Sequence, residues 1–413
     1  MLRFNRSNTA RRSFNFMKYF PSLLAAVALL YCQRPLIASE TASTTPAQRW
    51  TVERAQTWYR SYPWLVGANF VPSTAINQLE MWQADTFDPA TIDRELGYAE
   101  DIGMNTMRVF LHDLAWREDP QGFYSRVDKY LEIADRHGVK TLFVIFDAVW
   151  HPNPQPGKQP NPVPGRHNSG WVQSPGRAYL KSPEKQDELK PYVVSVLTHY
   201  KNDSRILGWD LFNEPDNPNR SAYGRDGENI ELNEADKEKF ATQLLEKTFR
   251  WAREVNPSQP LTCGVWLGDY LNKPTPLQRL QIEQSDVISF HNYDAPEVLQ
   301  ERIEGLEKLG RPVLCTEYMA RGNHSTFRGS LPVLKKYHVA AWNWGLVNGK
   351  SNTIYPWDSW QKHYTNEPAV WFHDVFRRDG TPFSSAETDF IRELTGRGKV
   401  MHANTEAAAV LVK

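Results

Sequence analysis

The segment Ile206–Pro215, with the sequence ILGWDLFNEP, constrains the fold more than any other stretch of the chain. Its apolar positions carry three aliphatic and two aromatic side chains, as expected for a strand buried on both faces. Asn213 and Glu214 follow directly, and Pro215, which has no amide hydrogen, takes the chain out of the sheet. In a parallel α/β barrel the C-terminal end of a strand lies at the catalytic face. We therefore expect Glu214 to act as a catalytic acid rather than as a charge in a surface loop.

Strand-like apolar runs alternate with helical segments along most of the chain. The alternation implies parallel strands joined by crossovers, and we predict a closed (β/α)8 TIM barrel, an α/β fold with long βα-loop insertions. The longest insertion is rich in proline and glycine and covers residues 150–179. The predicted strands are residues 64–70, 104–110, 139–146, 206–213, 260–266, 286–291, 312–316 and 338–344. The predicted helices are residues 88–103, 125–137, 182–200, 234–255, 296–309 and 384–394.

The chain divides into one catalytic domain and two terminal segments. We predict a signal peptide over residues 1–39, a linker and N-terminal lead-in over residues 40–59, the barrel over residues 60–396 and a frayed tail over residues 397–413. Basic residues precede an apolar run at residues 23–30, and Ala38 and Ser39 offer a cleavage site. The expected location is therefore outside the cytoplasm, either secreted or periplasmic.

Three questions about the leader stay open. Translation starts at Met1 or at Met17, and Arg11-Arg12 resembles a twin-arginine export signal. A retained membrane anchor is the alternative to cleavage, but the apolar run is too short to span a bilayer comfortably.

The charge balance limits the class of partner. The chain has 48 Lys plus Arg and 48 Asp plus Glu, so no global field attracts nucleic acid or an anionic membrane. We expect an uncharged partner, no stable membrane anchor and a monomer. The 15 Trp residues suit the faces of sugar rings as well as the core. Cys263 and Cys315 lie in apolar runs and are expected to be buried thiols.

A second glutamate occupies the equivalent place on the seventh predicted strand. Glu317 ends the sequence VLCTE, so two carboxylates on nearly opposite strands can flank one bond of a ligand. On the sixth strand, His291 and Tyr293 point the same way and can reach a carboxylate. Arg108 can hold a carboxylate ionised, and Trp344 offers a flat apolar floor. Three of these have an alternative role: Arg108 in a structural ion pair, His291 as a core histidine with its hydrogen bonds satisfied, and Trp344 in barrel packing.

Other barrel chemistries fit this sequence poorly. Metal-dependent barrel hydrolases commonly place a His-x-His pair on the first strand, where this chain has VGANF. The turns MARGNH and GLVNGK lack the glycine-rich character of a phosphate-binding barrel. We therefore expect no metal and no other cofactor.

These residues, in this order, resemble clan A glycoside hydrolases. The elements are Arg108, Asn213-Glu214-Pro215, His291-x-Tyr293, Glu317 and Trp344, and within the clan they are most similar to family 5, the cellulase and mannanase group. The resemblance covers about residues 60–395. The stretches FDAVWHPNP and GRHNSGWVQSPG also resemble bacterial chains labelled β-1,4-xylanase.

The resemblance implies a role for each matched residue. Glu214 corresponds to the acid/base and Glu317 to the nucleophile of a retaining double displacement, while Asn213 corresponds to the ligand of the sugar 2-hydroxyl. Tyr293 and Arg108 would orient Glu317 and keep it ionised, and His291 would line the acid/base side. Separately from the resemblance, six tryptophans are candidate platforms for sugar rings, with some of them serving the core: Trp116, Trp150, Trp171, Trp266, Trp357 and Trp360.

One position departs from the family pattern. Family 5 members usually carry a histidine two residues after the Asp that ends strand three, but Asp147 is followed by Ala148 and Val149. Either a bulge brings in His151, or His112 serves instead.

The predicted function is a secreted retaining β-glycosidase that acts on a β-linked, and by resemblance β-1,4-linked, glycan. A non-catalytic glycan-binding barrel, or an exo-acting β-glycosidase or β-mannosidase in place of an endo-glycanase, remains the alternative.

Overall fold

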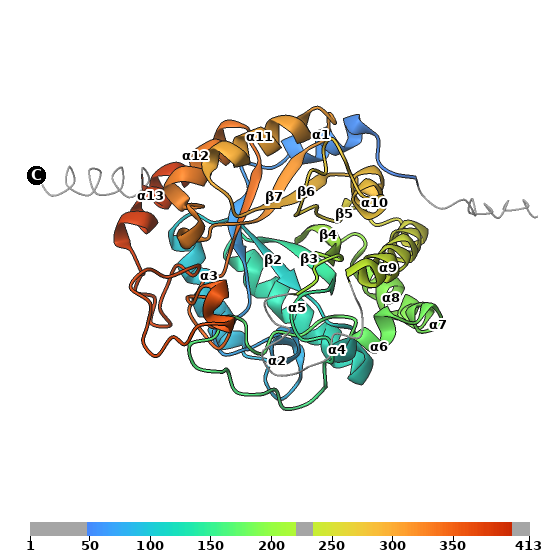
Figure 1. Cartoon of the computed structure of the whole chain (residues 1–413), viewed down its shortest axis with the longest axis horizontal. Helices are drawn as coiled ribbons and strands as arrows, with labels where there is room; N and C mark the ends of the chain where they lie inside the picture. Colours follow the sequence, from blue (N-terminus) through green and yellow to red (C-terminus); the bar gives the residue numbers. More distant parts are fainter. Residues whose placement is uncertain (1–47, 220–233, 399–413) are drawn as a thin grey trace, which may run out of the picture. The chain divides into compact units, whose positions relative to one another are not determined.

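The computed structural model describes residues 48–219 and 234–398 (Figure 1). The predicted signal peptide lies outside the described residues, as do most of the predicted linker and tail. Among the residues that are described, no helix combines the length and the apolarity needed to cross a membrane.

Eight parallel strands form one sheet in the order β5-β4-β3-β2-β1-β8-β7-β6. The ends of this sheet meet through a parallel bridge between Val265 and Phe290, where Val265 N donates to Ser289 O at 3.1 Å and His291 N donates to Val265 O at 2.9 Å. The sheet is thereby a barrel, which confirms the predicted fold class. The strands are β1 Val66–Asn69, β2 Thr106–Phe110, β3 Lys140–Asp147, β4 Ile206–Asn213, β5 Leu261–Thr262, β6 Ile288–Asn292, β7 Val313–Tyr318 and β8 Ala340–Trp344.

Helices surround the strands in Figure 1. The principal helices are α1 Val52–Arg60, α2 Gln78–Trp82, α3 Pro89–Asp101, α4 Asp113–Glu118, α5 Pro120–Arg136, α6 Arg177–Leu180, α7 Pro183–Asp187, α8 Lys190–Tyr200, α9 Glu234–Val255, α10 Pro276–Gln284, α11 Pro296–Glu307, α12 Phe327–Lys336 and α13 Ser385–Thr395.

Three predicted elements differ from the structure for local reasons. The fifth strand is shorter than predicted, because Cys263 N bonds the Ser285 hydroxyl instead of a neighbouring strand. Helix α5 begins earlier, at Pro120, because the Asp119 carboxylate caps it by accepting from Gly122 N. The predicted helix over residues 182–200 is two helices, α7 and α8, and Pro191 stands in the first turn of the second.

The N-terminal lead-in belongs to the barrel. Helix α1 packs its buried Ala55 and Tyr59 in one apolar cluster with Leu65, Leu142 and Leu207, which lie just before β1 and within the first three residues of β3 and β4. This cluster fills the end of the barrel where the strands begin. The opposite end, where the strands finish, is therefore the end available for a site.

Two long segments meet at that opposite end. Residues 148–176 follow β3, and residues 345–384 follow β8 and contain the short helix η2, Trp357–Trp360. His167 N donates to the Ser359 hydroxyl at 3.0 Å, and Asn168 N donates to Ser351 O at 2.8 Å. The insertion after β3 is thus an ordered structure held against the segment after β8.

Candidate active site

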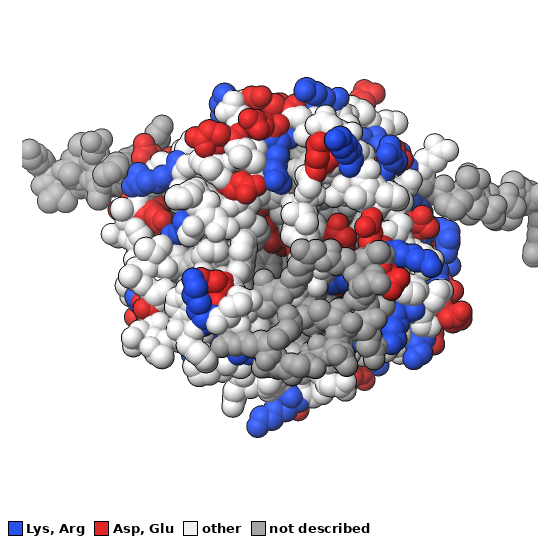
Figure 2. Space-filling view, viewed as in Figure 1, with Lys and Arg blue, Asp and Glu red and all other residues white. Residues whose placement is uncertain are grey.

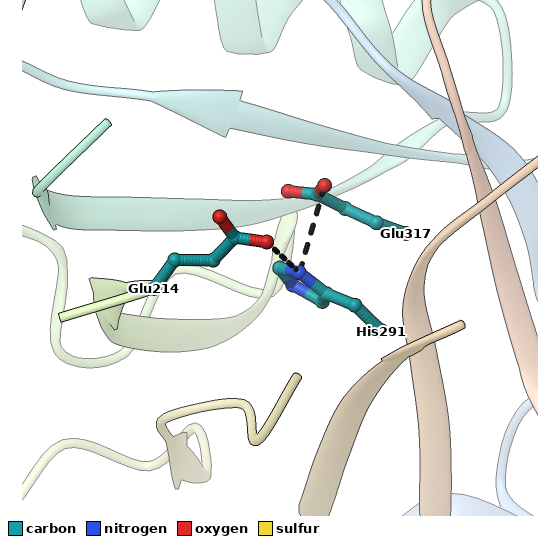
Figure 3. Close-up of side chains that lie close together, drawn as sticks. All are labelled: Glu214, His291 and Glu317. Atoms are coloured by element: carbon teal, nitrogen blue, oxygen red, sulfur yellow. Dashed lines mark hydrogen bonds and ion pairs between the residues drawn. The ribbon is translucent and has the colours of Figure 1, made fainter. Parts of the chain in front are cut away.

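Two glutamates and a histidine from three strands converge at the C-terminal end of the barrel. Glu214 follows β4, His291 lies on β6 and Glu317 lies on β7 (Figure 3). His291 Nδ1 lies 2.8 Å from Glu214 Oε1 and 3.5 Å from Glu317 Oε2. One carboxylate oxygen of each glutamate and a ring nitrogen of His291 all lie within 4.8 Å of one another. The two carboxylates therefore share one pocket, although 103 positions separate them in the sequence.

Arg108 lies beneath the two carboxylates and is fully buried. Its guanidinium makes five hydrogen bonds, which matches its five N–H donors. Nε and Nη2 donate to Asp210 Oδ2 at 3.0 and 2.8 Å. Nη1 donates to Asn69 Oδ1 and to Glu317 Oε1, and Nη2 also donates to Asn213 Oδ1, each at 2.8 Å. One cation thereby binds four polar side chains, two carboxylates and two amides.

Glu317 is surrounded by donors. Besides Arg108, the Tyr293 hydroxyl donates to Oε2 at 2.8 Å. Burial raises the pKa of the Glu317 carboxyl and the nearby Glu214 carboxylate adds to the rise, whereas Arg108 and Tyr293 oppose it. The hydrogen bonds from Arg108 and Tyr293 are of the kind that stabilise the ionised form.

Glu214 has weaker support for its charge. Asn217 Nδ2 donates to Oε2 at 2.5 Å, and the His291 ring faces Oε1. Burial raises the pKa of Glu214 to about 7, and the nearby Asp216 carboxylate adds to the rise. Its φ is 41°, in the left-handed region that a residue with a side chain seldom adopts. This strained turn directs the carboxyl group at the end of β4 toward the shared pocket.

The imidazole between the glutamates is neutral. Burial lowers the pKa of His291 to about 4, and Nε2 has no hydrogen-bond partner. A neutral ring carries one proton, so either Nδ1 donates to an ionised Glu214 or a protonated Glu214 donates to Nδ1. His291 can therefore accommodate both protonation states of Glu214.

The end of β3 supports Asn213 from behind. Asn213 Nδ2 donates to Asp147 Oδ1 at 2.9 Å, and Trp171 Nε1 donates to Asp147 Oδ2 at 2.6 Å. Burial raises the pKa of Asp147 to about 6. With its carbonyl oxygen on Arg108 and one amide hydrogen on Asp147, Asn213 retains one hydrogen for a ligand.

A cavity of about 580 Å³ opens above these residues, within the range typical of ligand sites. Figure 2 shows a hollow in this view, with acidic side chains in it and beside it. Eight residues predicted from the sequence line the cavity: Trp150, Asn213, Glu214, Trp266, Tyr293, Glu317, Trp344 and Trp357.

Four predicted polar residues do not line the cavity. Arg108 and His291 lie behind it and act on the glutamates by direct contact. His112 is buried and accepts from Leu114 N through Nδ1, and His151 takes part in a backbone bridge with Val172. The structure therefore does not bring His112 or His151 to the cavity, and no bulge restores the histidine of the family pattern.

Several lining residues were missed in the sequence. His167, Asn168, Asn217 and His373 all border the cavity, as does Trp357, which was expected as a platform. Asn217 lies three residues after Glu214, and this closeness in sequence indicated that it could border the same cavity. His167, Asn168 and His373 come from the two long segments after β3 and β8, whose conformation no periodicity reveals.

Lys237 joins the loops after β3 and β4. Its ammonium group donates to Ala148 O at 2.8 Å and to Asn217 O. Burial lowers the pKa of Lys237 to about 7, against the pull of Asp147, Asp216 and Glu214. This lysine positions the backbone of the loop that carries Asn217.

Glu214, His291 and Glu317 are close enough together to offer three ligand atoms to a metal ion. The surroundings favour another role, because the Arg108 guanidinium already supplies a positive charge 2.8 Å from Glu317. Two close carboxyl groups, one hydrogen-bonded by a guanidinium and a phenol and one with a pKa raised to about 7, suit proton transfer combined with nucleophilic attack.

Comparison with known proteins agrees with this chemistry. A family model described as Cellulase (glycosyl hydrolase family 5) matches residues 70–363. No curated protein matches the chain.

Solved structures show a similar fold at low sequence identity. The exo-β-1,4-mannosidase Op5Man5 from Opitutaceae bacterium strain TAV5 has a TM-score of 0.53 at 18% identity, over 82% of this chain and 60% of that chain. The chain thus spans less than two thirds of that protein. The endo-β-1,4-mannanase from Thermotoga petrophila has a TM-score of 0.51 at 13% identity, over 80% of this chain and 76% of that chain. A GH5_18 variant from Streptomyces cattleya, in complex with Manb1-4GlcNAc, has a TM-score of 0.53 at 10% identity, over 80% of each chain.

Proposed function

The chain belongs to glycosyl hydrolase family 5 and is a glycoside hydrolase, and we propose that it cleaves β-1,4-linked glycans with retention of anomeric configuration. Glu317 is the nucleophile of this proposal and Glu214 is the acid/base. The observation that carries it is the convergence of the two carboxylates, with oxygens within 4.8 Å of each other. Retaining enzymes hold their carboxyl groups about 5 to 5.5 Å apart, whereas inverting enzymes need about 6.5 to 9.5 Å for a water molecule.

In the first step a carboxylate oxygen of Glu317 attacks C1 of the sugar. The bond between C1 and the leaving oxygen breaks, and Glu214 transfers its proton to that oxygen. The raised pKa of Glu214 supports this role, because an acid must carry its proton at the working pH. Asn213 is positioned to donate its remaining amide hydrogen to the sugar 2-hydroxyl as charge develops on the ring.

In the second step Glu214 acts as a base instead of an acid. Glu214, now ionised, removes a proton from water, and the water oxygen attacks C1 from the face that the leaving group vacated. The bond between C1 and Glu317 breaks, and the carboxylate returns to the hydrogen bonds of Arg108 and Tyr293. Two inversions at C1 give net retention.

We also propose that the protein is exported, since basic residues, an apolar run and small residues follow one another within residues 1–39. N-terminal sequencing of the mature protein is the direct test. A mature chain that still begins at Met1 or Met17 would contradict cleavage.

Two measurements test the function: hydrolysis of a glycan substrate, and the anomeric configuration of the first product. The purified protein is incubated with xylan, mannan, β-glucan and the matching aryl β-glycosides, and the first product is followed by proton NMR. We expect hydrolysis of at least one substrate and a β-configured first product. An α-configured first product would contradict retention, and binding without hydrolysis of any substrate would contradict the proposed activity.

A further inference from the structure

Trp150 and Trp344 border the cavity at the ends of β3 and β8, and further buried aromatic side chains pack behind them. We call Phe110, Trp150, Trp171 and Trp360 the aromatic wall. Trp150 stacks on Trp360 with centroids 5.2 Å apart and an interplanar angle of 9°, and Phe110 meets Trp171 edge-on at 5.3 Å. All four are at most 8% exposed and form one apolar cluster with Trp344 packed against it. The barrel mouth is therefore filled with side chains on this side.

Hydrogen bonds fix the aromatic wall in place. Trp171 Nε1 donates to Asp147 Oδ2 at 2.6 Å, and Trp360 Nε1 donates to His167 O at 2.8 Å. Behind Trp344 the space that remains is about 20 Å³, which holds about one water molecule. A second sugar ring cannot continue past the aromatic wall.

The catalytic groups define which part of the sugar chain faces this wall. Glu214 protonates the leaving oxygen, so the leaving group lies on its side of the cavity, toward Asp216 and Trp266. The sugar that Glu317 attacks lies on the other side, between Glu317 and the aromatic wall. The closed end of the cavity therefore receives the non-reducing part of the chain.

Three buried polar side chains lie at this closed end, and two of them have a polar atom without a partner. His373 Nδ1 lies 2.6 Å from Met319 O and must donate to it, so its Nε2 is an acceptor, and Nε2 has no partner. His167 Nδ1 donates in the same way to Tyr355 O at 2.9 Å, which leaves its Nε2 as an acceptor. Asn168 Oδ1 has no partner either. All three residues are at most 1% exposed and line the cavity.

Unpaired buried acceptors are costly unless a ligand satisfies them. Sugar hydroxyl groups are donors of the required kind. Burial lowers the pKa of His167 to about 4 and also lowers that of His373, so both rings keep their acceptor nitrogens at neutral pH.

We propose that the cavity is a closed pocket for one terminal sugar, whose hydroxyl groups donate to His167, Asn168 and His373, so that the enzyme removes single units from the non-reducing end of a β-linked chain. This proposal rests on the proposed function and specifies its substrate as a chain end.

The first experiment follows products from a β-linked hexasaccharide labelled with a fluorophore at its reducing end. The sugar and linkage are those of the polysaccharide or aryl glycoside that the wild-type protein hydrolyses. We expect a labelled pentasaccharide and free monosaccharide at the earliest time point. Labelled disaccharide or trisaccharide appearing first would overturn the proposal, since those products require internal cleavage.

Paired substitutions test the two histidines. His373→Asn keeps an amide donor near the position of Nδ1 for Met319 O and removes the Nε2 acceptor, whereas His373→Gln restores an acceptor there. We expect His373→Asn to lower kcat/KM roughly tenfold and His373→Gln to recover part of that loss. His167→Asn and His167→Gln form the same pair, and His199→Asn, at an exposed position outside the cavity, is the control.

Deoxy analogues of the aryl glycoside separate recognition from structural support. Removing the hydroxyl that contacts His373 lowers kcat/KM for the wild-type protein, and we expect the same removal to have little further effect in His373→Asn. Equal penalties for every deoxy analogue in wild type and both Asn variants would overturn the assigned recognition. Hydrolysis with internal cleavage refutes this inference alone, whereas no hydrolysis of any glycoside refutes the proposed function beneath it.

Discussion

The ends of β4 and β7 each present one buried glutamate, yet their surroundings differ in kind. Glu317 receives hydrogen bonds from a guanidinium and a phenol. Glu214 faces a neutral imidazole and an amide, and the negative Asp216 lies nearby. Burial raises the pKa of both carboxyl groups, so burial does not separate their roles. The hydrogen-bond partners separate them, because only those of Glu317 include a guanidinium, whereas Arg108 and Lys237 act on Glu214 without a hydrogen bond to it.

The backbone differs between the two ends as well. Glu317 is part of β7, where the extended chain sets its direction, whereas Glu214 follows β4 at a φ of 41°. The Glu317 carboxylate is thus positioned by a regular strand and an ion pair. The Glu214 carboxyl group is positioned by a strained turn and a loop.

The strongest test of this difference replaces each glutamate. We expect Glu317→Gln to lower kcat about 10⁴-fold on every aryl β-glycoside, because no other group forms the bond to C1. Glu214→Gln should lower it about 10²- to 10⁴-fold on substrates with poor leaving groups and less on 2,4-dinitrophenyl glycosides, whose leaving oxygen needs little protonation. Steady-state kinetics across a leaving-group series measures both.

Azide distinguishes the roles further. Azide should restore turnover by Glu317→Gly and yield an α-glycosyl azide. It should restore turnover by Glu214→Ala and yield a β-glycosyl azide. Glu95→Gln, a buried glutamate outside the cavity, is the control and should keep wild-type turnover. Full activity in either catalytic Gln variant would refute the assigned pair.

Tyr293→Phe tests the support of the ionised side. The lost hydroxyl stabilises the Glu317 carboxylate, so its removal should raise the Glu317 pKa and shift the acidic limb of kcat/KM to higher pH by about 1 unit. Activity below the optimum should fall about tenfold. Tyr318→Phe removes a buried hydroxyl that has no partner, at the next position on β7, and should leave the pH profile unchanged. An unmoved acidic limb in Tyr293→Phe would argue against Glu317 as the group that must be ionised.

Two substitutions near Glu214 should move the alkaline limb in opposite directions. Asn217 donates to the carboxylate, so Asn217→Leu should raise the Glu214 pKa above about 7 and extend activity to higher pH. Asp216 disfavours the charged form, so Asp216→Asn should lower the Glu214 pKa and shorten the alkaline limb. We expect shifts of about half a pH unit to one unit, read from kcat/KM profiles. Shifts of the same sign would show that another group sets this limb.

The smallest expected effect is on stability. The folded pKa of Glu214, about 7, exceeds the unfolded value of 4.5, so the folded state binds more protons between these values and loses stability as pH rises through that window. Glu214→Gln removes this cost and should raise Tm by about 2 to 4 °C at pH 8, with no gain at pH 4. Glu317→Gln should lower Tm, because its amide nitrogen would face the donors of Arg108 or Tyr293. Thermal melts at both pH values check the two signs.

The sequence predicted the barrel and its two glutamates because those features are local. Continuous apolar runs mark buried parallel strands, and a polar residue that ends such a run must lie at one face of the barrel, as Glu214 and Glu317 do. The fifth strand was predicted too long and α12 was not predicted. Helix caps and hydrogen bonds between side chains distant in sequence determine where such elements form and end.

The closed end of the cavity was beyond prediction for a related reason. Trp150 and Trp360 stack although about 200 residues separate them, and the contact depends on two irregular segments that no hydrophobic period describes. His112 and His151 were chosen by their distance in sequence from the strand ends. Neither histidine lines the cavity, since the His112 ring caps α4 and the backbone of His151 is part of a bridge with Val172.

Arg108 has a consequence for how the chain acquires activity. Its partners belong to β1, β4 and β7, and Glu317 is 209 positions away from it in sequence. A nascent chain or a half-barrel fragment that lacks β7 has the guanidinium but not its last carboxylate. The pair of Arg108 and Glu317 therefore forms only when β7 has joined the barrel. Catalytic activity can then serve as a measure of complete folding.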